Sequence, residues 1–196
     1  GLAQLSLKLP DLPTQAEKDL GKIETCVIYS REIIKKLMEF SRQSQLCKEK
    51  NDLNELVENS ITFLEARCIK EGITIVKKYG DNISVTVDPH QIKQVITNLT
   101  INAIQAMKNG GELIFTTRKD HNNAILCVED TGIGISSENI SKTFLPFFTT
   151  KDVGEGTGLG LSVVYGIIKN HNGDIKISSE LGKGTVFEVC LPLEEN

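Results

Sequence analysis

Apolar positions at helical spacing open the chain. Three leucines of the first nine residues lie on one helical face: Leu2, Leu5 and Leu9. The segment Pro10-Asp11-Leu12-Pro13 predicts a loop that ends this helix. A second helix is expected to begin at the capping-box spacing of Thr14 and Glu17. Its seam positions then recur at intervals of three and four over most of thirty residues: Leu20, Ile23, Val27, Ser30, Ile34 and Leu37.

Two helices joined by a short loop form a hairpin with an exposed apolar seam. Nothing else in residues 1–48 covers that seam. A four-helix bundle formed with a second copy of the chain is the economical way to bury it. The pattern therefore predicts a homodimer through residues 1–48. The alternative is a single long helix that packs on its own domain.

From Leu53 onward the pattern changes to helices that alternate with strands. One helix is expected from Leu53 to near Gly72, and Asp88-Pro89 supplies an N-cap and a first-turn proline for another over 91–107. Strand-like stretches follow the alternation of apolar and polar residues: 73–76, 83–87, 112–118, 124–129, 174–179 and 184–191. Residues 49–196 are therefore predicted to form an α+β domain, a sandwich whose mixed sheet is covered by helices on one face.

Composition narrows the possible functions. Lys and Arg number 22 and Asp and Glu 26, and the net charge of −4 gives no electrostatic reason to expect nucleic acid or an anionic membrane as a partner. Five cysteines without a CxxC pair argue against a disulfide framework and a zinc site, and they fit a reducing cytosol. No stretch approaches about 18 consecutive apolar residues. We expect a cytoplasmic chain that makes no membrane contact.

The helix over 91–107 carries the first candidate chemistry. Four amide side chains share one face beside its apolar stripe: Gln94, Asn98, Asn102 and Gln105. Amides in a largely buried helix need polar partners, and a neutral carbonyl oxygen can complete a magnesium shell made mostly of phosphate and water. The alternative is a polar outer face without a function.

Two glycine-rich turns carry further candidates. The strand over 124–129 delivers Asp130 to its end, where Gly132 and Gly134 let a ligand approach the backbone and the carboxylate can accept a hydrogen bond from an exocyclic amine. An ordinary tight turn explains the same pattern. Further on, the loop over 154–160 has four glycines and leads into an apolar helix, whose N-terminus favours phosphate.

An aromatic segment precedes that glycine loop. Residues 144–148 contain three of the seven phenylalanines, which favours a hinged lid whose aromatic side chains dock when ligand is present. The alternative is an ordinary hydrophobic loop anchor. The glycine loop itself lacks Gly-Lys-Ser/Thr, and no strand directly precedes it, so it is neither a P-loop nor a dinucleotide fingerprint.

Taken together and in this order, the four motifs resemble the N, first glycine, F and second glycine boxes of bacterial sensor histidine kinases. The resemblance runs from about Ile28 to Pro192, and Phe-Phe-Thr-Thr-Lys and Gly-Lys-Gly-Thr-Val-Phe are most similar to the nitrogen-regulator type. It implies a Bergerat-type ATP-binding sandwich of the GHKL class after a dimeric helical hairpin. It also implies a response-regulator receiver domain as partner, and a complete protein that can be anchored in a membrane.

The resemblance implies a role for each matching residue. Asn98 would bind magnesium, Asn102 would contact phosphate or the metal, and Asp130 would read the adenine amine. Gly132 and Gly134 would shape the pocket wall, and Thr185 would support adenine through water. Gln105 and Ile135 would be further cofactor-binding residues. The phosphates would be wrapped by the backbone of Gly156, Thr157, Gly158, Leu159 and Gly160, with Lys151 near the γ-phosphate. The implied mechanism is in-line transfer of that phosphate to a histidine, with Gln94, Asn98 and Lys151 as the catalytic residues.

The sequence departs from the family in one respect. Its histidines are His90, His121 and His171, and none stands in the His-Glu-x-x-Asn context of a phosphoacceptor. The first five residues resemble the segment that lies about three helical turns after that histidine in the family. We therefore expect the chain to bind nucleotide without phosphorylating itself.

Two other functions use the same motifs. Gyrase-like and chaperone ATPases activate water with a Glu four residues before the magnesium Asn, where this chain has Gln94, which cannot take a proton. This favours a kinase over an ATPase. The remaining alternative is a nucleotide-binding scaffold without transfer activity.

Overall fold

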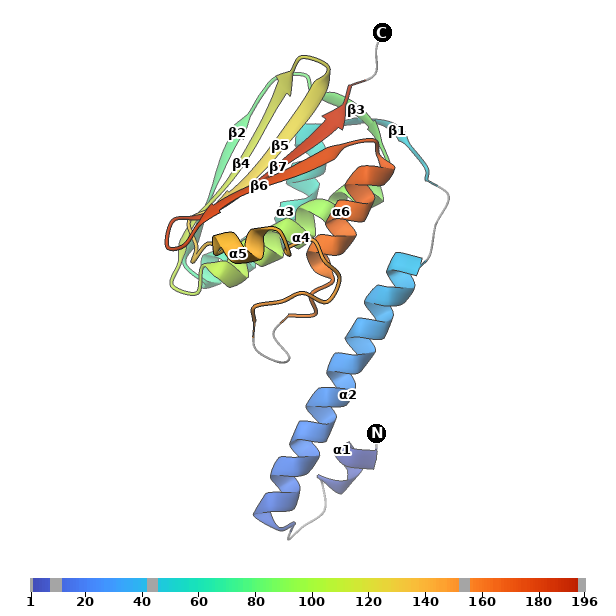
Figure 1. The fold of residues 1–196 in the computed structure, drawn as a ribbon, viewed down its shortest axis with the longest axis vertical. Coiled ribbons are helices and arrows are strands. Elements are labelled where there is room, and N and C mark those ends of the chain that lie inside the picture. The colour runs from blue at the N-terminus through green and yellow to red at the C-terminus, as the bar shows by residue number, and fades with distance from the viewer. Residues whose placement is uncertain (1, 8–11, 42–45, 152–155, 194–196) are drawn as a thin grey trace.

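The computed structural model describes residues 2–7, 12–41, 46–151 and 156–193. It consists of an N-terminal pair of helices and a two-layer α/β sandwich, with α2 extending away from the sandwich (Figure 1). Pro10 and Asp11 of the predicted loop over 10–13 lie outside the described residues, as do Leu9 of the first predicted helix, the side chain of Leu37 and Gly154 of the glycine loop.

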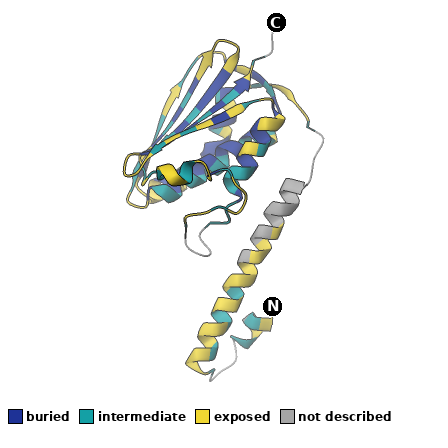
Figure 2. Ribbon diagram, viewed as in Figure 1, coloured by how far each residue is buried: buried dark blue, intermediate teal, exposed yellow. Residues whose placement is uncertain are grey.

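The N-terminal helices agree with the periodicity of the sequence. They are α1 (Leu2–Ser6) and α2 (Thr14–Ser41), and α2 begins at the predicted Thr14. Figure 1 shows α1 folded back beside the first turns of α2. The seam residues Ile23, Val27 and Ile34 are 52%, 62% and 57% exposed (Figure 2). Within this one chain, therefore, these three seam residues are exposed, whereas Leu20 is half-buried.

The sandwich consists of one mixed sheet and three main helices. The sheet order is β2-β4-β5-β7-β6, with β2 parallel to β4 and the other neighbours antiparallel. Figure 1 shows α3, α4 and α6 on one face of this sheet. The helices are α3 (Leu53–Lys70), α4 (Pro89–Ala106) and α6 (Gly160–Asn170). The strands are β2 (Ile73–Tyr79), β4 (Gly111–Asp120), β5 (Asn123–Asp130), β6 (Asp174–Glu180) and β7 (Gly184–Pro192). The predicted fold class is confirmed.

The predicted N-cap of α4 forms as expected. The Asp88 carboxylate accepts hydrogen bonds from the backbone N–H groups of His90, at 3.0 Å, and Gln91, at 3.2 Å. Pro89 follows in the first turn, where a missing N–H costs nothing. The capped helix then presents its apolar stripe to the sheet. Buried positions of this stripe are Ile92, Val95, Ile96, Leu99 and Ala103.

Two short elements were not predicted. The strand β1 (Glu49–Asp52) pairs antiparallel with β3 (Ser84–Val87), at one end of the sandwich. Its four residues, Glu-Lys-Asn-Asp, are all polar, so alternation gave no signal, and only pairing with β3 makes it a strand. The other element is α5 (Ser137–Ile140), a single turn too short to show a helical period.

The core lies between the sheet and the helices. On β5, Leu126 and Val128 point into it, and on β4 Phe115 is completely buried. Burial of such side chains contributes about 1.5–3 kcal/mol each, so this layer supplies most of the stability of the sandwich. The alternation of β5 also ends with Asp130 on the inner face, which is why the acid reaches the helices rather than the solvent.

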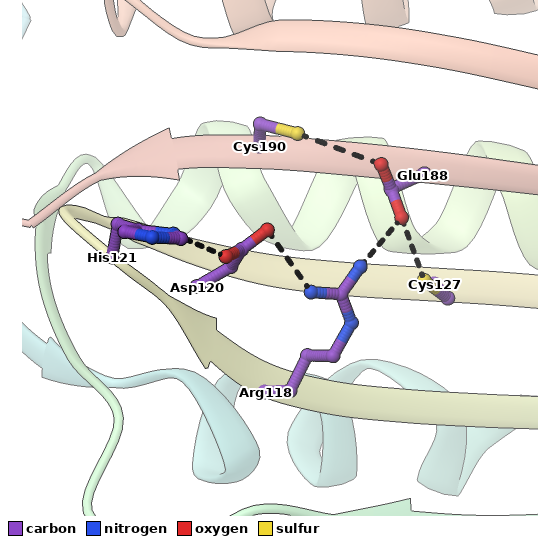
Figure 3. A network of polar contacts seen from close by, with 6 residues as sticks. All are labelled: Arg118, Asp120, His121, Cys127, Glu188 and Cys190. Atoms are coloured by element: carbon purple, nitrogen blue, oxygen red, sulfur yellow. Dashed lines mark hydrogen bonds and ion pairs between the residues drawn. The ribbon is translucent and has the colours of Figure 1, made fainter.

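The other face of the sheet carries a polar network (Figure 3). Arg118 on β4 pairs with Glu188 on β7 at 2.8 Å and with Asp120 at 3.3 Å. Partial burial, with Glu188 nearby, raises the pKa of the Cys127 and Cys190 thiols above their ordinary value. Because Arg118 is 44% exposed, these pairs stabilise the sheet little. No helix within the described ranges is long and apolar enough to cross a membrane.

Candidate active site

A cleft of about 1130 Å³ lies where α4, the ends of β5 and β7, and residues 143–151 and 156–160 meet. Most of the site residues named from the sequence line it: Asn98, Asn102, Gln105, Asp130, Gly134, Ile135, Lys151, Gly156, Thr157, Gly158, Gly160 and Thr185. Segments far apart in the chain therefore converge. Three named residues are not among the lining residues: Gln94, which is half-buried one turn before Asn98, Gly132 and Leu159.

The two asparagines of α4 face the start of α6. The Asn98 side chain donates from Nδ2 to the carbonyl oxygen of Gly160 at 3.4 Å. Since the nitrogen is the donor, Oδ1 is the atom left for a cation. One turn later, Asn102 Nδ2 is buried without a hydrogen-bond partner among the described residues. A buried N–H₂ group without an acceptor is costly, and a phosphate oxygen is the kind of acceptor it lacks.

Asp130 lies at the inner end of β5 and is 5% exposed. Its Oδ1 accepts a hydrogen bond from the backbone N–H of Gly132 at 2.9 Å. Burial raises the pKa of this carboxyl above the ordinary 3.8, while the N–H groups of Gly132 and Thr185 act in the opposite direction. The result is an acceptor group held in a dry position, directed at the cleft that it lines.

The turn after Asp130 is built on close backbone contacts. Gly134 has φ +69°, and a Cβ there would lie 2.1 Å from the carbonyl oxygen of Glu180. The carbonyl oxygen of Ile133 accepts a hydrogen bond from the backbone N–H of Gly182 at 2.9 Å. The turn is thereby attached to the connection between β6 and β7, which explains the need for glycine.

Residues 143–151 and residues 156–160, which we call the glycine segment, close the other side of the cleft. The Lys151 ammonium donates to Gln105 Oε1 on α4. Gly158, at φ +65°, accepts the backbone N–H of Phe147 at 2.9 Å, and a Cβ on Gly158 would lie 2.3 Å from the Phe147 carbonyl carbon. The ring of Phe144 lies 5.5 Å from that of Tyr165 on α6. The aromatic segment therefore anchors the glycine segment to α6 and α4.

Several lining residues have no counterpart in the sequence motifs. They lie on α2, at the end of α3, on α4 or just after it, and just before the aromatic segment: Thr25, Ile28, Arg67, Glu71, Ile101, Lys108 and Thr143. Arg67 and Glu71 end a helix whose sequence pattern predicts only an apolar inner face. Their place at the cleft depends on how α3 packs beside α4, which no local signal encodes.

The chain matches the family described as Histidine kinase-, DNA gyrase B-, and HSP90-like ATPase over residues 87–195. It is 37% identical over 190 residues to the sensor kinase CckA of Brucella abortus, covering 89% of this chain and 20% of CckA. The catalytic domain of histidine kinase ThkA is similar, with a TM-score of 0.67 and 34% identity over 74% of this chain and 95% of that chain. The structure of histidine kinase ThkA in complex with response regulator protein TrrA is also similar, with a TM-score of 0.78 and 28% identity. The match covers 99% of this chain and 56% of that chain.

The chain therefore belongs to this ATPase family, and within it to the catalytic domains of sensor histidine kinases. ATP is accordingly the nucleotide of its family. The chain spans about a fifth of the length of CckA. The nitrogen-regulator subtype stays a prediction.

Proposed function

We propose that the cleft binds Mg-ATP and that the chain transfers the γ-phosphate to a histidine on a helical hairpin. The observation that carries this proposal is the convergence of the amide face of α4, Asp130 and the glycine segment on one cleft. Each contributes a different chemistry: neutral oxygen for a cation, a carboxylate for an amine, and backbone N–H groups for phosphate.

The residues present fit magnesium held together with a triphosphate. Asn98 Oδ1 would be the protein ligand, with phosphate oxygens and water completing the shell, as this ion prefers. Asn102 Nδ2, which has no hydrogen-bond partner within the described ranges, would donate to a phosphate oxygen. Magnesium, when bound, would neutralise charge on the phosphates. The chain itself would orient the γ-phosphate with Asn98 and Lys151 and through the N–H groups at the start of α6.

Lys151 is proposed to contact the γ-phosphate. It lines the cleft, and its ammonium donates a hydrogen bond to the side-chain oxygen of Gln105 on α4. Gln105 therefore holds the Lys151 ammonium beside the cleft. Gln94, which cannot act as a base, leaves the chain without the water-activating Glu of the related ATPases.

We also propose a division into a hairpin over 1–48 and a catalytic part over 49–196, with homodimerisation through the hairpin. The exposed apolar residues of α2 support a bundle of this kind. A response-regulator receiver domain is the proposed acceptor of the phosphate from histidine. The similarity to ThkA, whose structure in complex with TrrA was solved, supports this partner. The reducing cytosol is the proposed location of this part of the protein.

Phosphoryl transfer to a supplied substrate tests the proposed function. The substrate is a separate helical hairpin that carries a His-Glu-x-x-Asn segment, and the control is the same hairpin with Gln in place of that histidine. We expect label from γ-labelled ATP on the first hairpin only, in an acid-labile form, and none with the Asn98→Ala variant of the chain. Steady phosphate release of tens per minute without labelling would instead indicate an ATPase.

A further inference from the structure

Ser179 on β6 contacts three groups around the base end of the cleft. Its Oγ accepts the backbone N–H of Ile135 at 2.8 Å and donates to the carbonyl oxygen of Gly184 at 2.8 Å. The same Oγ lies 2.9 Å from the hydroxyl oxygen of Thr185. Ser179 is half-buried and is not among the residues that line the cleft, whereas Thr185 is.

The direction of the hydrogen bond between the two hydroxyl groups follows from counting protons. A serine hydroxyl has one hydrogen and two lone pairs. The carbonyl oxygen of Gly184 can only accept, so the single hydrogen of Ser179 goes there. The N–H of Ile135 occupies one lone pair of Ser179, and the contact with Thr185 must therefore be donated by Thr185.

With this assignment, Thr185 Oγ1 can offer only its lone pairs to a ligand. Its one hydrogen is directed at Ser179, so toward the cleft the Thr185 oxygen acts as an acceptor. Asp130 lies directly opposite Thr185 across the β5–β7 pair, and its ionised carboxylate is also an acceptor. The base end of the cleft thus presents two acceptors side by side. A ligand group, or a bridging water, must bring hydrogens to this place.

We propose that Ser179 is a positioning residue that sets the base preference of the site by fixing the Thr185 hydroxyl as an acceptor. This inference rests on the proposed nucleotide site. The chemistry it selects is a purine with an amino group at C6, because such a group supplies hydrogens directly or through water. A purine with a carbonyl at the same position would set a third acceptor against two, leaving buried polar groups unpaired.

Comparison of ATP with inosine triphosphate tests the inference, because the two differ at C6, where a carbonyl replaces the amine, and at N1, which becomes protonated. The quantity to measure is the ratio of their dissociation constants by calorimetry with Mg²⁺, for the unmodified chain and for Ser179→Ala. In the variant, Thr185 loses its acceptor and can turn its hydrogen into the cleft. We expect the preference for ATP to narrow by roughly fivefold, the worth of one neutral hydrogen bond. It should not vanish, because Asp130 remains.

Three variants separate this role from a structural one. Ser178→Ala changes the exposed neighbour on the opposite face of β6 and should leave the ratio unchanged. Ser179→Thr keeps the hydroxyl and should restore the ratio. If Ser179→Ala does not fold, as its melting curve would show, Thr185→Val removes the acceptor directly and should narrow the same ratio, whereas Thr185→Ser should keep it.

The outcomes are distinguishable. An unchanged ratio in Ser179→Ala, with normal ATP binding, would overturn the role of Ser179 and leave the nucleotide site intact. If Thr185→Val is used because Ser179→Ala does not fold, an unchanged ratio in Thr185→Val would likewise overturn the role of Ser179. Absence of Mg-ATP binding by the unmodified chain would remove the proposed function, and with it this inference.

Discussion

The imidazole of His171 accepts a hydrogen bond through Nε2 from the backbone N–H of Asp88 at 3.0 Å, joining the end of α6 to the start of α4. Its Nδ1 lies 2.8 Å from the carbonyl oxygen of Ile167. An acceptor at Nε2 and a carbonyl beside Nδ1 together require the neutral ring with its hydrogen on Nδ1. The two helices that border the phosphate side of the cleft are thereby tied at their far ends.

Stability should depend on pH through His171. Burial lowers the pKa of this ring below the ordinary 6.5, with Lys48 acting in the same direction and the Ile167 carbonyl and Asp88 opposing it. Because the unfolded ring has the higher pKa, the unfolded state binds more protons, and stability falls as pH falls below about 6.5. Melting curves between pH 7.5 and 5 should show this slope. His171→Gln should reduce it, whereas His121→Gln, at an exposed position, should retain it.

Magnesium binding should depend on Asn98. The unmodified chain at 100 times the dissociation constant of Mg-ATP should gain about 2.7 kcal/mol of stability. Asn98→Ala removes the proposed metal ligand, so the difference between the thermal shifts with and without Mg²⁺ should disappear. Asn59→Ala, on the exposed face of α3, should keep it. A magnesium-dependent shift that survives in Asn98→Ala would contradict the assignment.

Base recognition should weaken in acid. Because burial raises the pKa of Asp130 above the ordinary 3.8, its carboxylate takes up a proton at a less acidic pH than an exposed Asp. Protonation places a hydrogen on a carboxylate that accepts hydrogen bonds when ionised, so the preference for ATP over inosine triphosphate should decrease as pH falls through this pKa. The ratio cancels the titration of the phosphates. Asp130→Asn should show a small preference that does not change with pH over the same range.

Gly158 and Gly160 provide a matched pair of substitutions in the glycine segment. Gly158 adopts φ +65°, and a Cβ would lie 2.3 Å from the Phe147 carbonyl carbon, whereas a Cβ on Gly160 would meet nothing within 4 Å. Gly158→Ala should weaken Mg-ATP binding by about tenfold, because it combines backbone strain with a backbone clash. Gly160→Ala keeps its N–H and should bind within about twofold of the unmodified chain. An equal loss of Mg-ATP affinity in the two variants, measured by calorimetry, would contradict the close packing of Gly158 against Phe147.

Lys151 should distinguish ATP from ADP. If its ammonium leaves Gln105 for the γ-phosphate, Lys151→Met should weaken binding of ATP while affecting ADP little. Lys142→Met, at an exposed position before the aromatic segment, is the control and should change neither. Equal loss for both nucleotides would place Lys151 at the α- or β-phosphate instead.

Much of the architecture follows from local patterns. The helices α3 and α4 and the longer strands appear where apolar periodicity predicts them. An element that buries one face must carry its apolar residues at the spacing that brings them to that face. The Asp88 cap and the turn after Asp130 also follow from short-range chemistry, since an N-cap or a glycine turn involves residues only a few positions apart. Strand β1 did not follow, because its polar residues form a strand only against β3.

The sequence by itself determined which residue types stand at the site: amides on one helix face, an acid at a strand end, and glycines before a helix. Tertiary structure alone decided that Ser179 meets Ile135 and Thr185. It also decided that Arg67 borders the cleft and that His171 accepts from Asp88, 83 residues earlier. The physical reason is that hydrogen bonds and packing depend on distance in space. Sheet register and helix packing set those distances, and no spacing along the chain records them.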